Sequence, residues 1–502
     1  MSRRRRAVLS VTDKTGLVDL GRRLVEHGYE LVASGGTAAH LGEAGLPVTE
    51  VAEITGQPEI LGGRVKTLHP ALHAGILAAR EEDLEATAFA PVDLVVVNLY
   101  DFAGAVARGG DEAQLVESVD IGGPTLLRAA AKNFDRVTVL CDPSFYGEFV
   151  GELERHQGGT CRNFRRRMAG VVMQRTSDYD RAIARQLFVE DGVPSRAHPL
   201  RYGENPHQKA WWRVVGGGEL ADLGLEVHGG KELSYNNIVD LVAALKLGLD
   251  LPEDACAVLK HTNPCGVGRG ADGVAAFERA LLSDPVSAFG GIVVLRRPVD
   301  GPTAEKLASL FLEVVAAPGY DEAARERLSR KKNLRWLSVD LGRFAAATRG
   351  SERRWGKLEL VQDEDEGFAE LDRWQHVAGP VPDDAAVEAG RLAWIVAKHV
   401  KSNAVVLADA SGLVGVGAGQ MSRVDSCHLA LRKARDAGLE VKGCAAGSDA
   451  FFPFPDGLEV LAEAGVSTVV QPGGSIRDED VVVAAERLGV SLCHTGVRHF
   501  RH

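Results

Sequence analysis

Short apolar runs followed by helical patterns recur along the first 140 residues of the chain. The predicted strands comprise residues 7–11, 30–33, 94–99 and 136–141. The predicted helices between them comprise residues 16–27, 37–44 and 125–132. Strands that alternate with helices in this way predict an α/β fold with a doubly wound parallel sheet, which binds its ligands at the carboxyl ends of the strands.

A change of pattern near residue 195 predicts two domains. Residues 162–190 have a charged helical pattern, and a segment rich in Pro, Gly and Ser follows, so we expect a boundary at residues 193–200 and domains at 1–195 and 196–502. The second domain again alternates, with strands predicted at 255–259, 291–295, 404–408 and 468–471. It divides into two packed subdomains roughly within 340–370, because residues 340–368 are charged, lack regular periodicity and are interpreted as a surface loop or excursion between the subdomains.

Composition excludes several classes of protein. The chain has 502 residues, of which 45% are hydrophobic and 25% charged, which is typical of a globular protein with several cores. A net charge of −11 argues against a nucleic-acid surface, and no run of about 18 apolar residues predicts a membrane span. The arginines at 3–6 are interpreted as a solvated tail rather than a targeting signal. Seven dispersed cysteines without a C-x-x-C spacing indicate reduced thiols and a cytoplasmic location.

The first domain carries glycine turns with hydroxyls and cations beside them. Ser34-Gly-Gly-Thr37 lies between a predicted strand and helix, where backbone N–H groups can bind an anion, although a tight turn capped by Thr37 explains the same pattern. The segments Gly62–Thr67 and Asp13–Thr15 add further cations and hydroxyls. Asn98 and Tyr100 end the longest buried strand, so both are candidate ligand contacts.

Four side chains of this domain suggest proton transfer. Lys66, Tyr100, Asp120 and Lys132 together can hold a nucleotide base while a proton moves on and off its exocyclic groups. The alternative for Asp120 and Lys132 is an ordinary pair of solvent-exposed charges. Because a straight helix would separate these two residues by about 15–18 Å, a shared role requires the helix to be short or interrupted.

In the second domain, Lys260 and His261 directly follow a predicted strand. A His at a strand end with a Lys beside it is a candidate general base with an electrostatic helper, although a lone His is more often structural. Pro264-Cys265 partly matches the signature of zinc deaminases. The second cysteine of P-C-x-x-C is missing and the chain contains no H-x-E, so we expect no catalytic metal.

Nine motifs together carry a family resemblance. They are SVTDKTG, SGGTA, GGRVKTLHP, DIGGPTLLRAAAKN, RYGENPHQ, KHTNPCG, GAGQMSR, SDAFFPFPDG and HTGVRHFRH, in this order. The chain resembles the bifunctional purine biosynthesis family, in which a formyltransferase acting on aminoimidazole carboxamide ribonucleotide (AICAR) is joined to an IMP cyclohydrolase. One departure is Asp101, where the family pattern has Pro, which leaves the loop of Tyr100 less rigid.

The resemblance implies a fold, an assembly and two reactions. It implies a methylglyoxal-synthase-like first domain, a transferase domain of two cytidine-deaminase-like subdomains without zinc, and a homodimer with transferase sites at the subunit interface. The transferase moves a formyl group from 10-formyltetrahydrofolate to AICAR, giving formyl-AICAR (FAICAR), and the cyclohydrolase closes FAICAR to IMP. Two alternatives remain, namely a first domain that only senses nucleotides and a zinc deaminase.

The resemblance also implies roles for individual residues. His261 takes the proton, Lys260 stabilises charge and Asn403 positions the formyl centre; in the cyclohydrolase, Lys132 shuttles protons beside Asp120, Tyr100 and Lys66. The implied nucleotide contacts of the first domain are Thr12, Asp13, Lys14, Ser34, Gly35, Gly36, Thr37, Arg64, Val65 and Thr67. The implied ribonucleotide contacts of the transferase are Arg201, Tyr202, Gly290, Glu313, Arg423, Phe451 and Arg498, and the implied folate contacts are Asp456, Gly473 and Gly474.

Overall fold

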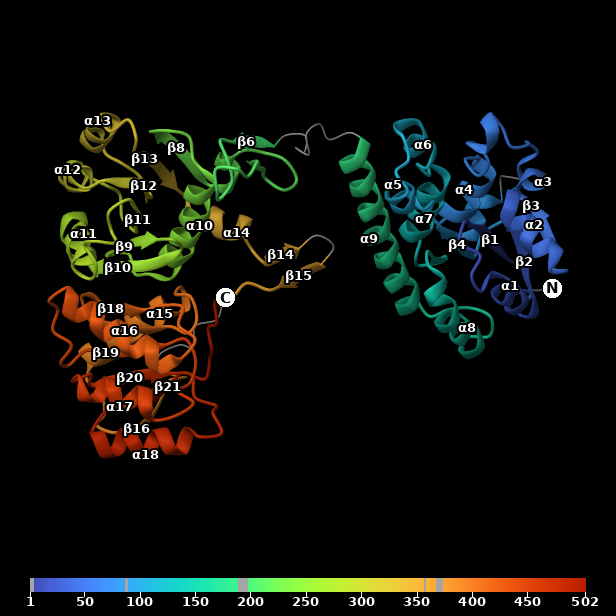
Figure 1. The fold of residues 1–502 in the computed structure, drawn as a ribbon. Helices are drawn as coiled ribbons and strands as arrows, with labels where there is room; N and C mark the ends of the chain where they lie inside the picture. The colour runs from blue at the N-terminus through green and yellow to red at the C-terminus, as the bar shows by residue number, and fades with distance from the viewer. Residues whose placement is uncertain (1–3, 86–88, 188–196, 356–357, 367–372) are drawn as a thin grey trace. The chain divides into compact units, whose positions relative to one another are not determined.

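The computed structural model describes residues 4–85, 89–187, 197–355, 358–366 and 373–502 (Figure 1). The chain divides into two compact units, Met1–Ser195 and Arg196–His502. The expected boundary segment falls largely on residues 188–196, which lie outside the described residues. Each unit has its own sheet.

A parallel sheet of five strands forms the centre of the first unit, in the order β3-β2-β1-β4-β5. The strands are β1 (Arg5–Val11), β2 (Tyr29–Ala33), β3 (Val48–Glu50), β4 (Leu94–Asn98) and β5 (Thr138–Leu140). Leu9 of β1 pairs with Ala33 on one side and Val96 on the other. All five residues of β4 are buried, as a continuous apolar run in a parallel sheet predicts. The four predicted strands and the parallel sheet are confirmed.

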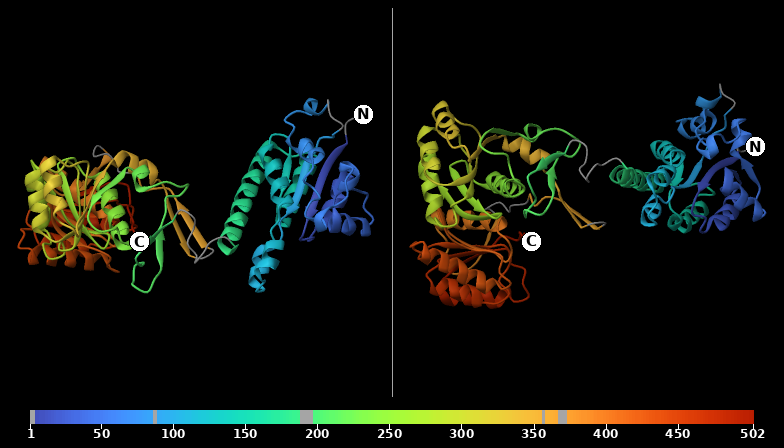
Figure 2. Two further views of the ribbon diagram at one scale, coloured as in Figure 1. Left: turned by 90° about the horizontal axis from the view of Figure 1, so that it is seen from above. Right: turned by 45° about the horizontal axis from the view of Figure 1, so that its top comes forward.

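Helices cover both faces of this sheet (Figure 2). They are α1 (Leu17–Glu26), α2 (Gly35–Glu43), α3 (Val51–Thr55), α4 (Pro70–Leu77), α5 (Phe102–Ala107), α6 (Glu112–Glu117), α7 (Gly122–Lys132), α8 (Tyr146–Arg155) and α9 (Arg162–Leu187). Helix α1 contacts α2 and α8, whereas α7 contacts α4 and α9. The loops after β1, β2 and β4 therefore meet at one edge of the sheet, where a doubly wound fold places its ligands.

The second unit is built on a mixed sheet of twelve strands with the order β16-β21-β20-β19-β17-β18-β10-β9-β11-β12-β13-β8. Its strands are β8 (Leu225–Gly229), β9 (Ala255–Lys260), β10 (Asn263–Arg269), β11 (Gly291–Leu295), β12 (Leu312–Ala317), β13 (Arg335–Val339), β16 (Gln375–Ala378), β17 (Val405–Asp409), β18 (Gly412–Gly417), β19 (Ala445–Ser448), β20 (Thr468–Gln471) and β21 (Ser491–His494). The predicted strands at 291–295 and 468–471 are confirmed with the same bounds, and those at 255–259 and 404–408 within one residue at either end.

The twelve strands form two halves with the same order. From the centre outward, β10-β9-β11-β12-β13-β8 in the first half corresponds to β18-β17-β19-β20-β21-β16 in the second. The helices also correspond: α10 (Tyr235–Asp250), α11 (Gly273–Leu282), α12 (Gly301–Ser309) and α13 (Glu322–Ser329) match α15 (Asp384–Lys398), α16 (Arg423–Asp436), α17 (Asp456–Glu463) and α18 (Asp478–Leu488). The halves join through an antiparallel pairing of β10 with β18 at Gly268 and Gly412.

Glycines allow α11 and α16 to lie very close to this central seam. A Cβ atom on Gly266 of β10 would lie 1.9 Å from the carbonyl oxygen of Ala280 on α11. A Cβ atom on Gly417 of β18 would lie 1.9 Å from the carbonyl oxygen of Ser426 on α16. Both distances are too short for any side chain, so in each half a glycine on the central strand allows the neighbouring helix to pack directly against the backbone.

Residues 340–368 are predicted as a surface loop or excursion, and the structure corrects this prediction in one respect, because the described part contains regular elements. The segment contains α14 (Leu341–Ala347) and an antiparallel hairpin of β14 (Ser351–Trp355) and β15 (Leu358–Gln362). Nearly all described residues of the hairpin are exposed, so its strands lack the alternation of buried and exposed positions that reveals a strand in the sequence. A second two-stranded sheet pairs β6 (His198–Leu200) with β7 (Ala210–Trp212).

Candidate active sites

Two ammonium groups lie beside the N-terminus of α2 in the first unit. A Cβ atom on Gly35 would lie 3.2 Å from Lys66 Nζ, and one on Gly36 would lie 3.8 Å from Lys14 Nζ. Both glycines are exposed, and Gly35 has a φ of 47°, which favours glycine. Because the N-terminus of a helix carries free N–H groups and a partial positive charge, this arrangement favours binding of a phosphate.

Asn98 holds the loop that carries Lys14. Its Oδ1 accepts hydrogen bonds from the backbone N–H groups of Thr12 (2.5 Å) and Asp13 (2.9 Å), and its Nδ2 donates to the carbonyl oxygen of Asp13 at 2.8 Å. Asn98 is buried at the end of β4. Its side chain is therefore used to connect the ends of β4 and β1, and the loop after β1 offers the groups that face solvent.

The hydroxyl of Thr37 is also used inside the unit. Thr37 Oγ1 accepts from the N–H of Val11 at 3.0 Å and donates to the carbonyl of Val11 at 3.1 Å. The side chain is 4% exposed. Thr37 thus fixes α2 to β1 and has a structural role, but it is not the cap that the alternative expected, because Ser34 is the N-cap of α2.

Asp120 lies two residues before α7, whose first residue, Gly122, is next to Thr67. Its Oδ1 accepts from the N–H of Gly123 at 2.8 Å, and a Cβ atom on Gly122 would lie 2.8 Å from Thr67 Oγ1. Burial raises the pKa of Asp120, and hydrogen bonds from the N–H groups of Gly123 and Tyr100 oppose this only in part. A carboxyl group with a raised pKa can give and take a proton closer to neutral pH, as acid–base catalysis requires.

The neighbouring segment contributes Lys66 and Arg64. Lys66 Nζ lies 3.2 Å from a carboxylate oxygen of Glu59, and Arg64 forms an ion pair with Glu117. Val65 closes the turn by bridging to Ile60. Tyr100, after β4, is 43% exposed, so its phenol is accessible to a ligand.

Lys132 lies at the other end of α7 from Asp120. The helix runs without a break over 11 residues, which places its two ends about 15 Å apart. The next residue, Asn133, donates to the carbonyls of Ile76 and Ala78 at 2.7 and 2.8 Å, at the C-terminal end of α4. The expectation of a short or interrupted helix is therefore wrong, and a role for Lys132 in cyclisation stays a prediction without support from this helix.

In the second unit, a strained turn presents His261. Lys260 of β9 pairs with Asn263 of β10, and the two residues between them, His261 and Thr262, have φ angles of 53° and 62°. Positive φ angles cost roughly 1–2 kcal/mol per non-glycine residue. Asp240 of α10 stabilises the turn by accepting the N–H of Thr262 at 2.7 Å, and the imidazole of His261 is exposed.

Lys260 points toward the turn that precedes β11. Its Nζ donates to the carbonyl oxygen of Phe289 at 2.5 Å. Gly290 has a φ of 72°, and a Cβ atom there would lie 3.7 Å from Lys260 Nζ and 3.5 Å from the ring of Phe311. Lys260 and His261 line a cavity of about 460 Å³, whose wall includes residues from both halves of the sheet.

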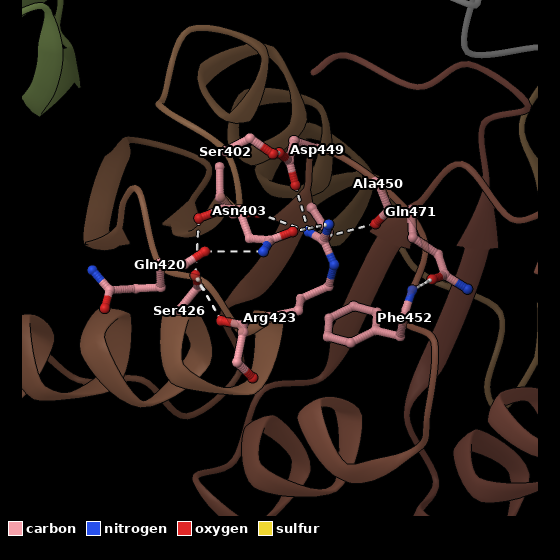
Figure 3. A network of polar contacts seen from close by, with 12 residues as sticks. Ser402, Asn403, Gln420, Arg423, Ser426, Asp449, Ala450, Phe452 and Gln471 are labelled. Carbon is pink, nitrogen blue, oxygen red and sulfur yellow. Dashed lines mark hydrogen bonds and ion pairs between the residues drawn. The ribbon is translucent and has the colours of Figure 1, made fainter. Parts of the chain in front are cut away.

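Asn403 belongs to a polar network before β17, which Figure 3 shows. Its Nδ2 donates to the carbonyl oxygens of Gln420 and Met421 at 2.9 and 3.1 Å, and its Oδ1 accepts from Arg423 NH2 at 2.8 Å. These bonds fix the orientation of the amide. Because both amide hydrogens are used, the free acceptor capacity of Oδ1 is what Asn403 can offer to a substrate.

Arg423 is buried, and its guanidinium is engaged within the chain (Figure 3). Besides Asn403, it donates to Ser448 Oγ at 2.7 Å and forms an ion pair with Asp449, which has no solvent exposure. The resemblance implies that Arg423 contacts the ribonucleotide. Among the described residues, its guanidinium holds the Asn403 side chain and neutralises the Asp449 carboxylate.

The remaining ribonucleotide candidates are spread over several elements. The guanidinium of Arg201 lies 5.0 Å from the ring centre of Tyr202, and that of Arg498 lies 4.4 Å from the ring of Phe500. Both arginines are exposed. Glu313 of β12 accepts from Asn237 Nδ2 at 2.5 Å. Phe451, just after β19, is partly buried.

The implied folate contacts lie beyond β19 and β20. Asp456 begins α17 and accepts the N–H of Gly457 at 2.7 Å. Gly473 and Gly474 follow β20 with φ angles of 71° and 93°, and a Cβ atom on Gly473 would lie 2.6 Å from His494 Nδ1. Only glycine fits this approach of the backbone to the imidazole.

A possible metal-binding group lies elsewhere in the first unit. Glu152, His156 and Cys161 have ligand atoms within 4.8 Å of one another. The Glu152 carboxylate already accepts the N–H of Cys161 at 2.9 Å and pairs with Arg155 at 2.7 Å. This group shares no residue with either candidate site.

Comparison with known proteins identifies the family. Residues 130–433 match the family described as AICARFT/IMPCHase bienzyme, and residues 16–125 match the MGS-like domain. The chain belongs to the AICARFT/IMPCHase bienzyme family. The first domain is MGS-like, as the resemblance implies.

Similar proteins match along their whole length. Proteins named "Bifunctional purine biosynthesis protein PurH" are 48% identical in Dinoroseobacter shibae, 46% in Desulfitobacterium hafniense and 47% in Nostoc sp.. The alignments cover 99% of this chain and 99–100% of these relatives. A solved structure titled "Crystal structure of ForH" is 34% identical over 36% of this chain, with a TM-score of 0.32. Among the described residues, no helix is long and apolar enough to cross a membrane.

Sequence reasoning missed the residues that support the reactive groups from a distance. Asp240 holds the His261 turn, Asp449 neutralises Arg423, and Asp284 pairs with Lys433 in the wall of the cavity. Each acts on a partner 22 or more positions away in the sequence. Spacing along the chain carries no signal for such contacts.

Proposed function

We propose that this chain catalyses the last two steps of purine nucleotide synthesis. Its second unit transfers a formyl group from 10-formyltetrahydrofolate to AICAR, which gives FAICAR. Its first unit closes FAICAR to IMP with loss of water. Membership of the bienzyme family supports both activities, and the observation that carries the transferase is the strained turn that presents His261 beside Lys260 in the cavity.

In formyl transfer, the AICAR amine attacks the formyl carbon. The amine is a weak nucleophile because its lone pair is delocalised into the imidazole ring and the carboxamide. His261 accepts the proton that the amine loses, and the Lys260 ammonium donates a hydrogen bond to the oxygen on which negative charge develops. The C–N bond to N10 of the folate then breaks, and the proton passes to N10. Asn403 presents its carbonyl oxygen to an N–H group of the reacting centre.

In cyclisation, the carboxamide nitrogen of FAICAR attacks the formyl carbon, and the formyl oxygen leaves as water. The helix N-terminus of α2 with Lys14 holds the phosphate. Asp120, whose pKa burial raises, moves the proton, and Lys66 stabilises charge on oxygen beside Tyr100. In the proposed steps 10-formyltetrahydrofolate is the co-substrate that supplies the formyl group, and the side chains named above carry the proton transfers and stabilise the developing charge without a catalytic metal.

We further propose that the two halves of the twelve-stranded sheet are the two cytidine-deaminase-like subdomains and that the protein acts as a cytoplasmic homodimer. The repeated strand order supports the subdomains, and seven free cysteines suit a reducing compartment. The exposed apolar side chains of the β14–β15 hairpin support a subunit interface, because an isolated two-stranded hairpin is marginally stable. These side chains are Trp355, Leu358, Leu360 and Val361.

The full chain tests the proposal directly. Incubation with AICAR and 10-formyltetrahydrofolate should change folate absorbance and produce IMP, and supplied FAICAR should give IMP without folate. Formation of FAICAR without IMP would leave the first unit as a binding module. On dilution, transferase activity should fall as the dimer dissociates, whereas full specific activity of a demonstrated monomer would contradict a shared site.

A further inference from the structure

The ammonium group of Lys260 is oriented by the segment between α11 and β11. Its hydrogen-bond acceptor, the carbonyl oxygen of Phe289, belongs to residues 284–290. At the end of this segment, the N–H of Gly290 donates to the carbonyl of Phe311 at 2.8 Å. The position of the Phe289 carbonyl, and with it the position of the ammonium, therefore depends on what fixes this segment.

Asp284 fixes its beginning. One carboxylate oxygen accepts the N–H of Ser287 at 2.9 Å, and the other accepts the Ser287 hydroxyl at 2.7 Å. The carbonyl of Asp284 accepts the N–H of Ala288 at 3.1 Å. Three bonds thus bend the chain within five residues, directly before the Phe289 carbonyl that accepts from Lys260.

Lys433 holds the Asp284 carboxylate from the other half of the sheet. Its Nζ lies 2.6 Å from Asp284 Oδ2, and the Asp284 side chain is 14% exposed. Burial raises the pKa of Asp284, but hydrogen bonds from Lys433 and Ser287 outweigh this and lower it. The carboxylate is therefore charged at neutral pH, and its partner lies 149 positions away in the sequence.

Lys433 also belongs to the helix that carries Arg423. Helix α16 begins at Arg423, which holds Asn403, and Lys433 lies near its end. Asp284, Lys433, Lys260 and His261 line the same cavity. One rigid helix therefore contacts the support of Lys260 at one end and the support of Asn403 at the other.

We propose that Asp284 and Lys433 are positioning residues for formyl transfer: the pair clamps residues 284–290 so that the Phe289 carbonyl holds the Lys260 ammonium against the formyl oxygen. The inference rests on the proposed transferase function. In this proposal, neither Asp284 nor Lys433 contacts a substrate. A displacement of a reacting group by about 1 Å can cost about 100-fold in rate, so the clamp can control turnover from outside the reacting centre.

A second ion pair provides a matched control. Arg279 of α11 bonds Asp409 of β17 at 2.8 Å, so this pair also joins the two halves. It does not include the segment at 284–290. If Asp284–Lys433 only held the halves together, loss of either ion pair would have similar consequences.

The experiment compares the full-length variants Asp284→Ala, Lys433→Met, Lys433→Arg and Asp409→Asn with the unaltered chain. The transferase kcat and the KM for AICAR are measured, together with cyclisation of supplied FAICAR as a folding control. We expect kcat to fall about 10- to 100-fold in Asp284→Ala and Lys433→Met with KM within about threefold, and to stay within about threefold in Lys433→Arg and Asp409→Asn.

A direct readout of Lys260 separates positioning from stability. Acylation of Lys260 by an amine-reactive ester, followed by peptide mass spectrometry, should be at least about threefold faster in Asp284→Ala than in Asp409→Asn, because the released amine becomes more accessible. Unchanged kcat and unchanged Lys260 labelling in both Asp284→Ala and Lys433→Met would overturn the inference. If Asp284→Ala does not fold, the kcat and the Lys260 labelling of Lys433→Met alone decide whether the inference holds. An unaltered chain without transferase activity would instead refute the proposed function.

Discussion

Replacement of Arg423 by Met is the perturbation whose result follows most directly from the structure. The guanidinium bonds Asn403, Ser448 and Asp449, and both members of its ion pair are buried, with side-chain exposures of 6% and 0%. Methionine has a similar length but no charge or donor. The variant therefore leaves the Asp449 carboxylate without its cation and removes the one hydrogen bond that Arg423 donates to Asn403 Oδ1, while the two bonds from Asn403 Nδ2 remain.

The expected loss of stability is large. Removal of one partner of a buried ion pair costs about 3–5 kcal/mol, because the remaining charge is uncompensated. In a unit of this size, Arg196–His502, such a loss corresponds to a decrease in melting temperature of about 5–8 °C. For comparison, Arg279→Met leaves behind an Asp409 side chain that is 46% exposed and can be hydrated, so we expect a smaller loss of stability from that variant.

The kinetic signature distinguishes positioning from binding. If Arg423 orients Asn403, formyl transfer by Arg423→Met loses kcat by about 10- to 100-fold while the KM for AICAR changes little. Arg423→Lys keeps the positive charge but loses the forked geometry of the guanidinium, so its kcat should lie between that of the unaltered chain and that of Arg423→Met. Denaturant unfolding, transferase kinetics and cyclisation of supplied FAICAR are measured on the same preparations. A KM for AICAR raised by about 30-fold with kcat and stability unchanged would refute this reasoning and restore a direct contact with the ribonucleotide.

Three further predictions concern the reacting groups themselves. His261→Ala should lower formyl transfer by about 10²–10⁴-fold and leave cyclisation of FAICAR intact; equal loss of both activities would contradict separate sites. Asp120→Asn should abolish most cyclisation and remove the acidic limb of its pH profile, since the native rate rises as pH increases through the raised pKa of this carboxyl. The stability that this raised pKa contributes is present at low pH and is lost as pH rises through the same range, which urea unfolding at several pH values checks. Gly35→Ala should weaken binding of FAICAR and IMP by about tenfold or more, because its φ is 47° and its Cβ atom would meet Lys66 and Glu59 at 3.2 Å; unaltered affinity in a calorimetric titration would contradict a phosphate site at α2.

The sequence predicts those elements whose burial is uniform. Strands β11 and β20 were predicted with their observed bounds, because central strands buried on both faces are continuous apolar runs between turns. The hairpin of β14 and β15 was missed because it is exposed on both faces and has no such contrast. Its hydrogen bonds alone define it as a sheet, and hydrogen bonding leaves no periodic signal in the residue types.

For the candidate sites, the sequence identifies reactive residue types but not their supports. Lys260 and His261 are recognisable because a polar pair interrupts the pattern at the end of an apolar strand. The positive φ angles of the His261 turn are not predictable, since two-residue turns of this kind usually contain Gly, Asn or Asp and this one contains none of them. The resemblance implies that Arg423 contacts the ribonucleotide, and only tertiary packing shows that its guanidinium is buried against Asp449.

The turn between β9 and β10 in the first half of the large sheet corresponds to the turn between β17 and β18 in the second half, and the two turns lie at opposite ends of the strands. The residues of the two turns differ, and this difference explains why the proposed reactive groups lie at the first turn. In the second half, Asp409 pairs with Gly412 and its carboxylate accepts the N–H groups of Ser411 and Gly412 at 2.7 and 2.9 Å, so this turn is held by its own first residue. In the first half, the corresponding position is Lys260, whose ammonium cannot accept those bonds. The turn at His261 therefore needs an acceptor from outside, which α10 supplies. Because that acceptor satisfies the backbone without using the Lys260 side chain, the ammonium is free to reach the Phe289 carbonyl in the cavity. The two halves share a fold, but the acidic residue at the end of β17, Asp409, corresponds to a basic residue at the end of β9, Lys260. Only the turn after β9 therefore presents the proposed reactive pair.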